Sequence, residues 1–157
     1  MTQQPQSVGI ESPLGPLQLW AEDGQITGLD WQEGPELTDQ TPKVLHDAAL
    51  QLSAYFRGEL TAFDLPMRLG PGDFQAIFQN ALLNIPYGET RTYGDLAKEI
   101  GVSAQAAGQA CGANRIPTLV PCHRVLGASS LGGFSGAGGV ETKVELLKLE
   151  GAGGLLI

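Results

Sequence analysis

Alternating apolar and polar positions near the start of the chain predict a small antiparallel sheet. Leu17–Trp20 and Ile26–Trp31 both alternate in this way and are rich in residues that favour strands. Between them, the residues from Glu22 to Gly24 have the composition of a hairpin turn. A further short strand is expected at Phe63–Pro66.

A helical repeat of apolar residues follows the predicted hairpin. Thr41 is placed as the cap of this helix, Pro42 suits its first position, and Gly58 ends it. The apolar residues at helical spacing are Val44, Leu45, Ala48, Ala49, Leu52, Tyr55 and Phe56. A small antiparallel sheet with one helix predicts an α/β domain over residues 1–66.

A change of composition predicts a second domain over residues 72–157. Arg68–Gly72 is the best candidate for a linker because it combines glycine and proline. The next helix begins at Asp73 and ends before Pro86, and one of its faces is apolar. That face is expected to consist of Phe74, Ile77, Phe78, Ala81, Leu82 and Ile85.

The next segments have a helix-turn-helix outline. Pro86–Glu89 is a predicted turn, and Thr92 can cap a helix that runs to Ile100 and stops at Gly101. Ser103 then caps a second short helix that reaches Cys111, which leaves a three-residue turn containing glycine. Such a corner occurs both in DNA-binding proteins and in ordinary helical cores, so the outline leaves both readings open.

The composition is that of a globular protein with a proper core, since 42% of its 157 residues are hydrophobic. No apolar stretch approaches the roughly 20 residues of a membrane span, and the first residues lack the pattern of a secretion signal. We therefore expect a cytoplasmic protein with no membrane partner. Two cysteines are too few for a disulfide framework, and His46 and His123 show no metal-ligand spacing, so no metal site is expected.

The formal charge of −8 argues at first against a nucleic-acid partner, but its distribution changes this picture. Residues 1–65 hold ten acidic residues against two basic ones, whereas residues 66–157 hold seven of each. A neutral second half can present a local basic face to DNA while the acidic first half points away. Any salt-dependent part of the affinity should be modest.

The candidate chemistry lies in the sequence Pro121-Cys122-His123-Arg124-Val125. A cysteine needs a nearby base or positive field to react as a thiolate, and His123 can supply it. The preceding run, Ile116–Pro121, is β-prone, so Cys122 is expected where a short buried strand ends in a turn. Neighbouring residues of a strand point to opposite faces. Cooperation between Cys122 and His123 therefore requires a bend or a bridging water, of which we expect the water.

The alternative for each cysteine is an inert, buried small side chain. For Cys122 the neighbouring histidine favours reactivity. For Cys111 the surrounding alanines and glycines favour a buried, unreactive thiol.

Taken together, these motifs resemble those of the O6-alkylguanine-DNA alkyltransferases. The resemblance rests on P-Y-G-E at 86–89, T-Y-G-D-L-A at 92–97, Asn114 and P-C-H-R-V at 121–125, and it covers about residues 72–151 closely. It implies a ribonuclease-H-like α/β N-terminal domain with a small antiparallel sheet. It also implies a mainly helical C-terminal domain, whose winged helix-turn-helix-like motif binds the minor groove of double-stranded DNA. The damaged base is then flipped out, because an alkylated guanine oxygen inside the stack is out of a thiolate's reach.

The resemblance also implies roles for the catalytic residues. Cys122 would accept the alkyl group, and a bound water, His123 and Glu150 would form a relay that activates it, as in a catalytic triad. Tyr93 would donate a hydrogen bond to the flipped purine as guanine leaves. Asn114 would brace the turn around the nucleophile.

Further residues are assigned by the same resemblance. Those expected to line the pocket for the base are Val125, Phe134, Ser135 and Lys143. Those expected to contact DNA are Thr92, Tyr93, Gln105, Ala106, Arg115 and Arg124. Phe134 and Ser135 fall in the glycine-rich loop Gly127–Gly139, which would form a pocket wall.

Three positions depart from the family pattern. Gln105 stands where the family usually has an arginine that fills the space left by the flipped base, so weaker capture of duplex DNA is expected. Arg115 replaces a common proline after Asn114 and adds a positive charge near the phosphates. Phe134 replaces a frequent tyrosine, which makes the pocket wall apolar and leaves the accepted alkyl size open.

The implied function is direct-reversal repair of DNA. One methyl group would move irreversibly from O6-methylguanine, and from O4-methylthymine as a possible second substrate, to Cys122, with no cofactor and no turnover. The alternative is a non-catalytic sensor that binds and flips alkylated bases and recruits other factors, although such relatives lack the cysteine. A cysteine hydrolase would need an oxyanion hole that the sequence does not indicate. A monomer is expected, with cooperativity on DNA left open.

Overall fold

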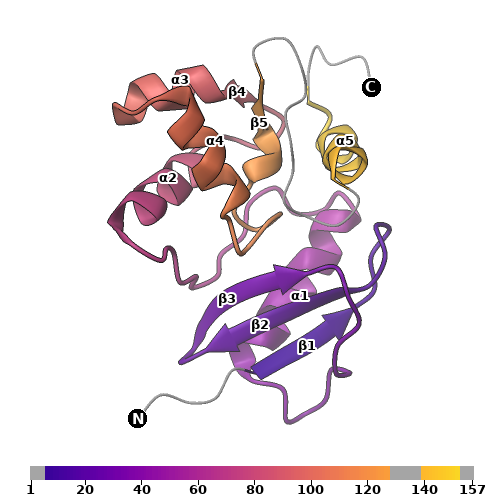
Figure 1. The fold of residues 1–157 in the computed structure, drawn as a ribbon. Helices are drawn as coiled ribbons and strands as arrows, with labels where there is room; N and C mark the ends of the chain where they lie inside the picture. The colour runs from indigo at the N-terminus through magenta and orange to yellow at the C-terminus, as the bar shows by residue number, and fades with distance from the viewer. Residues whose placement is uncertain (1–5, 128–138, 153–157) are drawn as a thin grey trace. The chain divides into compact units, whose positions relative to one another are not determined.

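The computed structural model describes residues 6–127 and 139–152. Its internal contacts divide the chain into two compact units, Met1–Arg68 and Leu69–Ile157 (Figure 1). Each unit has its own core, and each is described separately.

The first unit contains a three-stranded antiparallel sheet. Its strands are β1 (Gln6–Ile10), β2 (Leu17–Glu22) and β3 (Gln25–Asp30), with β2 in the centre. The turn between β2 and β3 consists of Asp23 and Gly24, whose φ angles of 51° and 77° are both positive, as a two-residue turn of the type I′ class requires. The predicted hairpin is confirmed.

Helix α1 (Lys43–Phe56) packs on this sheet and contacts all three strands. Its buried residues, Leu45, Ala48, Ala49, Leu52 and Tyr55, belong to the predicted apolar repeat. The helix begins one residue later than expected, because Pro42 is the cap. The hydroxyl of Thr41 instead accepts a hydrogen bond from the backbone N–H of Thr38 at 2.9 Å.

The strand predicted at Phe63–Pro66 does not form. The chain there is irregular, and a single β-bridge joins the next residue, Met67, to Ile26 of β3. The side-chain amide of Gln51 on α1 bonds the backbone N–H and carbonyl of Asp64, at 2.8 and 3.0 Å, which ties this segment to the helix. The end of the segment also meets the sheet, since the Pro66 carbonyl accepts from the N–H of Ile26 at 2.8 Å.

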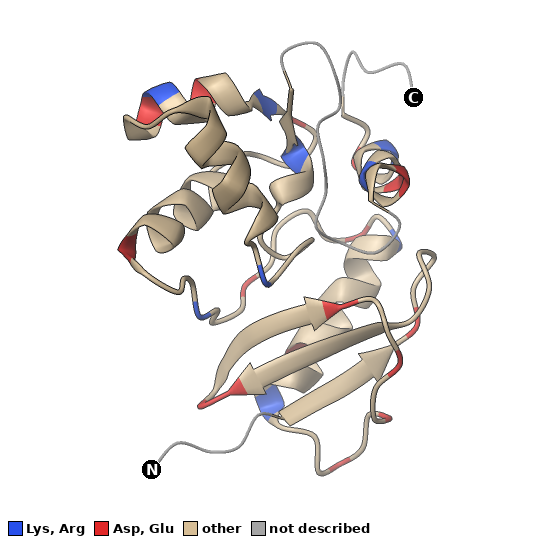
Figure 2. Cartoon of the chain, in the orientation of Figure 1, with Lys and Arg blue, Asp and Glu red and all other residues tan. Residues whose placement is uncertain are grey.

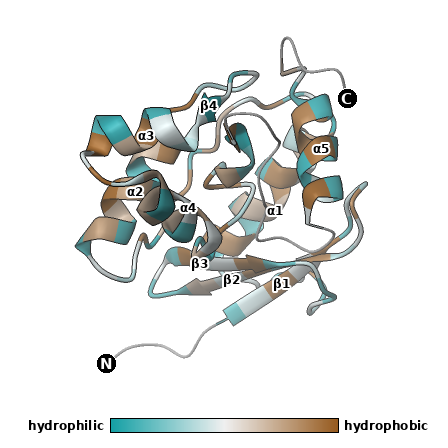
Figure 3. Cartoon of the chain, turned by 45° about the horizontal axis from the view of Figure 1, so that its top comes forward, coloured by the Kyte–Doolittle hydropathy of each residue, from teal (hydrophilic) through white to brown (hydrophobic). Residues whose placement is uncertain are grey.

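The second unit is mainly helical. Helix α2 precedes the predicted helix-turn-helix. A short parallel pair of strands joins the residues just before the helix-turn-helix to the residues just after η1, and α5 follows. These elements are α2 (Asp73–Leu83), β4 (Arg91–Thr92), α3 (Tyr93–Ile100), α4 (Ala104–Gly112), the 3₁₀ turn η1 (Cys122–Arg124), β5 (Val125–Leu126) and α5 (Val140–Leu149). Figure 3 shows hydrophobic and hydrophilic residues alternating along α5, as expected for a helix with one buried side.

The helix-turn-helix outline is confirmed, with its predicted caps. Thr92 and Asp95 form a reciprocal capping box at the start of α3, and Gly101 ends that helix with a left-handed φ of 85°. Ser103 caps α4 by accepting from the N–H of Ala106 at 3.1 Å. Helices α3 and α4 pack against each other, and both contact α2.

The buried face of α2 differs from the predicted one. Phe78 and Leu82 are buried as expected, but the side chains of Phe74 and Ile77 are 40% and 54% exposed. The interior positions in their place are held by two glutamines, described with the site below. Among the helices within residues 6–127 and 139–152, none combines the length and apolar character that a bilayer crossing needs.

Candidate active site

Cys122 follows a buried turn instead of the predicted strand. The segment Ile116–Pro121 is buried, and Thr118 within it has a φ of 76° that no strand contains. The N–H of Val120 donates to the carbonyl of Ile116 at 2.8 Å, and the N–H of Cys122 donates to the carbonyl of Val120 at 2.8 Å. The chain then enters η1, so it bends at Cys122 and His123.

Asn114 holds the two ends of this buried turn. Its Nδ2 donates to the carbonyl of Val120 at 2.9 Å, and its Oδ1 accepts from the N–H of Ile116 at 3.1 Å. The side chain is 5% exposed. An amide that bonds both a carbonyl and an N–H replaces the pairing that a sheet would give this segment, which fits the predicted bracing role.

Gln79 supports Asn114 from α2, and the sequence interpretation missed it. Its Nε2 donates to Oδ1 of Asn114 at 3.2 Å, while its Oε1 accepts from the N–H of Gly70 at 2.7 Å. One helical turn earlier, Gln75 Nε2 donates to the carbonyl of Ala110 on α4 at 2.8 Å. The signal available in the sequence was the spacing of two glutamines at i and i+4 beside buried apolar residues.

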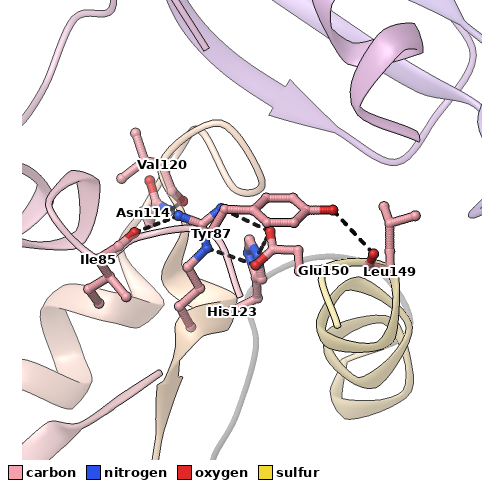
Figure 4. A network of polar contacts seen from close by, with 8 residues as sticks. Ile85, Tyr87, Asn114, Val120, His123, Leu149 and Glu150 are labelled. Carbon is pink, nitrogen blue, oxygen red and sulfur yellow. Dashed lines mark hydrogen bonds and ion pairs between the residues drawn. The ribbon is translucent and has the colours of Figure 1, made fainter. Parts of the chain in front are cut away.

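The carboxylate of Glu150 binds two basic side chains in the interior, as Figure 4 shows. Nε2 of His123 lies 2.7 Å from Oε2 of Glu150, and both side chains are 0% exposed. Arg124 donates from Nε to Oε1 at 2.8 Å and from Nη2 to Oε2 at 2.9 Å. Its Nη1 donates to the carbonyl of Ile85 at 2.6 Å. The network therefore connects the end of α5, η1 and the end of α2.

His123 is held as a neutral base. Burial lowers its pKa; the hydrogen bond and charge of Glu150 oppose this, and the charges of Arg124 and Lys143 lower it further. A neutral ring that donates from Nε2 to Glu150 keeps its lone pair on Nδ1. Nδ1 is buried and has no hydrogen-bond partner among the residues that the structure describes. The basic nitrogen therefore lies on the side of the ring away from Glu150.

The prediction that Arg124 contacts DNA needs correction. Its side chain is 8% exposed and its guanidinium is engaged by Glu150 and Ile85. A bidentate pair in the interior fixes the orientation of a carboxylate more firmly than a single bond does. Arg124 therefore holds the carboxylate of Glu150 in the interior, and its guanidinium is not placed to meet a phosphate.

The turn Pro86–Glu89 contacts the end of α5 next to this network. The hydroxyl of Tyr87 donates to the carbonyl of Leu149 at 3.2 Å, and the Arg124 guanidinium lies 5.9 Å from the centre of its ring. Gly88 has a φ of 81°, and a Cβ there would come within 3.3 Å of the Glu150 carbonyl oxygen. The P-Y-G-E motif thus has a local reason for its glycine.

Lys143 approaches the same site from the first turn of α5. Its Nζ donates to the carbonyl of Val125 at 2.5 Å and lies 5.9 Å from the centre of the Tyr93 ring. Burial lowers the pKa of Lys143, and the nearby thiols Cys111 and Cys122 oppose that effect. Of the predicted pocket residues, Val125 and Lys143 are therefore brought together. The other two, Phe134 and Ser135, lie outside the described residues.

The second cysteine lies beside the first. Cys111 is 6% exposed, as expected for a buried thiol, and its Sγ lies 3.7 Å from the carbonyl oxygen of Cys122. Its pKa is raised, mainly by a hydrogen bond with the Cys122 side chain and next by burial. No pattern in the sequence indicated this contact across eleven residues.

Apart from Arg124, the residues expected to contact DNA lie at the end of β4, on α3 and α4, and in the segment after α4. Gln105 and Arg115 are exposed, Ala106 and Tyr93 are partly exposed, and the Thr92 hydroxyl caps α3. Helix α4 carries no charged residue, as its uniform colour in Figure 2 shows. Of the six basic residues in Leu69–Ile157, Arg124 and Lys143 are buried. The four that remain at the surface are Arg91, Lys98, Arg115 and Lys148.

Comparison with known proteins identifies the family of this chain. Residues 9–69 match the family model of the 6-O-methylguanine DNA methyltransferase ribonuclease-like domain, and residues 73–152 match that of the 6-O-methylguanine DNA methyltransferase DNA-binding domain. The chain belongs to the O6-alkylguanine-DNA alkyltransferase family. Among the described residues no group of three or more His, Cys, Asp or Glu side chains could hold a metal ion.

Individual alkyltransferases resemble the chain over nearly its full length. The methylated-DNA–protein-cysteine methyltransferase of Mycobacterium tuberculosis strain H37Rv is 47% identical over 149 residues, which are 90% of this chain and 89% of the relative. The crystal structure of the M. tuberculosis O6-methylguanine methyltransferase has a TM-score of 0.81 at 42% identity, covering 98% of this chain and 97% of that chain. A crystal structure of M. tuberculosis OGT in complex with DNA has a TM-score of 0.80 at 46% identity, covering 93% and 92%. The predicted fold of both domains is confirmed.

Proposed function

We propose that this alkyltransferase repairs DNA by moving an alkyl group from O6-alkylguanine to Cys122. Membership of the family makes the protein a methyltransferase of the direct-reversal kind, with a cysteine as acceptor. The observation that selects Cys122 is the buried relay beside it, in which the Nε2 side of His123 is held by Glu150 and its Nδ1 is left as the basic nitrogen. The sensor alternative is not favoured, because the relatives are named as methyltransferases and Cys122, His123 and Glu150 are all present.

The proposed reaction uses a neutral His123. The proton of the Cys122 thiol passes through a water to Nδ1 of His123, and Glu150 stabilises the imidazolium that forms. The thiolate attacks the alkyl carbon, the sulfur–carbon bond forms, and the bond from that carbon to the guanine oxygen breaks. The electron pair stays on the base, which takes up one proton in place of the alkyl group, so the proton lost by Cys122 is balanced and the base remains in the strand as guanine. Tyr93 offsets the developing negative charge by hydrogen bonding to the purine.

The pocket for the base is proposed at the carbonyl of Val125. Lys143 already donates to this carbonyl and fixes its direction. Phe134 and Ser135 remain proposed members of the pocket wall, as does the acceptance of O4-alkylthymine. The thioether that results is not displaced under cellular conditions, so each molecule is expected to act once, without a cofactor.

The proposed DNA contact is the minor groove, through the helix-turn-helix of α3 and α4. Support comes from the relative that was crystallised in complex with DNA and from the exposure of Gln105 on α4 and of Arg115 just after it. Helix α4 has small residues that allow a close approach, but no charge of its own. Binding as a monomer is part of this proposal.

Adding the missing arginine should strengthen duplex binding. Gln105→Arg is expected to raise the affinity for an unmodified duplex by about fivefold to tenfold at low salt, because one more cation reaches the DNA. The measurement is a fluorescence-anisotropy titration at two salt concentrations. Gln109→Arg, one helical turn further along the exposed side of α4, makes the same change of charge and serves as the matched control. An equal gain in both variants, or none in either, would contradict the placement of Gln105 at the groove.

The central experiment identifies the acceptor directly. The protein is incubated with a duplex oligonucleotide that contains one O6-methylguanine, and its peptides are then mapped by mass spectrometry. We expect one methyl group on the Cys122 peptide, none on the Cys111 peptide, and loss of the lesion in equal amount. A duplex without the lesion is the control. Selective binding of the lesion without any methyl transfer would instead support the sensor.

A further inference from the structure

Two thiols from different elements meet in the interior of the second unit. Cys111, in the last turn of α4, and Cys122, the first residue of η1, are 6% and 1% exposed. Sγ of Cys111 lies 3.7 Å from the Cys122 carbonyl oxygen. The thiol of Cys111 therefore lies against Cys122, and both residues are buried.

This contact is held from both sides by buried amides. Gln75 Nε2 donates to the carbonyl of Ala110, the residue before the first cysteine, at 2.8 Å. Asn114 Nδ2 donates to the carbonyl of Val120, two residues before the second cysteine, at 2.9 Å. The backbone beside each cysteine is therefore anchored by a buried side chain.

Only one of these two thiols is suited to ionise. Two adjacent thiolates in an apolar interior would repel each other as well as lose their hydration. The Cys111 pKa is raised, mainly by its hydrogen bond with Cys122, so Cys111 keeps its proton. Cys122 is the thiol that adjoins His123. A proton that stays on Cys111 is then available as a donor to the neighbouring anion.

We propose that Cys111 is a further residue of the acceptor site and that its S–H donates a hydrogen bond to the Cys122 sulfur as the thiolate forms. This inference rests on the proposed role of Cys122. No bond to Cys111 is made or broken, since the Cys122 proton goes to His123 and the alkyl group goes to Cys122. The donor favours thiolate over thiol, which increases the reactive fraction near neutral pH.

The test compares three variants of Cys111. Cys111→Ala and Cys111→Val lack a donor and differ in volume, whereas Cys111→Ser retains one. The rate of Cys122 modification by iodoacetamide is measured against pH, with peptide mapping to separate the two cysteines. Single-turnover transfer from O6-methylguanine DNA is measured at the same pH values, and thermal unfolding checks that each variant folds.

The expected result is a shift of the pH profile. In both donor-free variants the midpoint for Cys122 modification should rise by about half a unit to one unit, so that modification and transfer are about threefold to tenfold slower near neutral pH. The difference should vanish above the midpoint, where the thiol is fully ionised in every variant. Cys111→Ser should recover most of the shift.

Two outcomes would overturn the inference. If the pH profile of Cys122 modification is unshifted in Cys111→Ala, no donor was lost. If the normal profile is recovered in Cys111→Val but not in Cys111→Ser, Cys111 only fills space. The iodoacetamide profile needs no DNA, so it separates this inference from the proposed function. A shifted profile with the methyl group found elsewhere would reject Cys122 as acceptor but keep the thiol contact.

Discussion

Cys122→Ser is expected to abolish methyl transfer from O6-methylguanine and to leave binding of the duplex unchanged. A serine hydroxyl is a far weaker nucleophile than a thiolate near neutral pH, and the water-mediated base His123 cannot make up that difference. Loss of the nucleophile should slow transfer by at least about a thousandfold. The measurement is methyl incorporation by intact mass, together with anisotropy binding to the same oligonucleotide.

Cys111→Ser is the matched control for that experiment. It replaces a cysteine by a serine in the same way, at a buried position that contacts Cys122. Transfer should persist in this control, since its hydroxyl can still donate to Cys122. A methyl group taken up by the Cys122→Ser protein with normal stoichiometry would show that the acceptor lies elsewhere in the chain.

Glu150→Gln should reduce both the rate of transfer and the stability of the protein. The variant removes the charge that stabilises the imidazolium of His123, so single-turnover transfer is expected to slow by about a hundredfold or more. It also leaves the guanidinium of Arg124 buried without its carboxylate, which should lower the free energy of unfolding by about 3–5 kcal/mol. Quench-flow transfer assays and urea unfolding measure the two effects.

Glu145→Gln provides the control on the same helix. Glu145 is exposed, and its Oε1 forms only a long ion pair of 3.9 Å with Nζ of Lys148. The same change of charge there should therefore alter the free energy of unfolding by less than about 0.5 kcal/mol. A Glu150→Gln protein that is as stable and as fast as this control would show that the buried network is dispensable.

Local signals in the sequence identified the helix-turn-helix correctly. Thr92, Asp95, Gly101 and Ser103 act on backbone groups within a few residues of themselves, so their roles can be read without the fold. The Asp23-Gly24 turn is equally local. For the same reason these elements needed no correction beyond their exact ends.

Burial of polar residues could not be read in this way. Gln79 is buried because Asn114, 35 residues later, accepts its hydrogen bond, and periodicity alone ranks Phe74 and Ile77 above it. Arg124 is buried because Glu150 is, 26 residues later. Each of these pairings depends on how distant elements pack, whereas the sequence reports only the average preference of each residue type.

The strand predicted at Ile116–Pro121 failed for a related reason. Its residues favour strands, but the side chain of Asn114 bonds both ends of the segment and turns it. Strand preference expresses how well side chains fit a pleated surface, and no neighbouring strand is paired along this segment in the described structure. The chemistry was therefore easier to predict than the backbone that carries it.

The burial of Arg124 and Lys143 has a consequence for how the protein finds its lesion. With these two bases and Glu150 in the interior, the surface of Leu69–Ile157 presents four bases against six acids. Such a surface does not attract a polyanion from a distance, so encounters with DNA should occur at the unsteered rate of about 10⁵–10⁷ M⁻¹s⁻¹. The rate of encounter should therefore be set by the concentration of the protein, with little help from electrostatic attraction to the duplex.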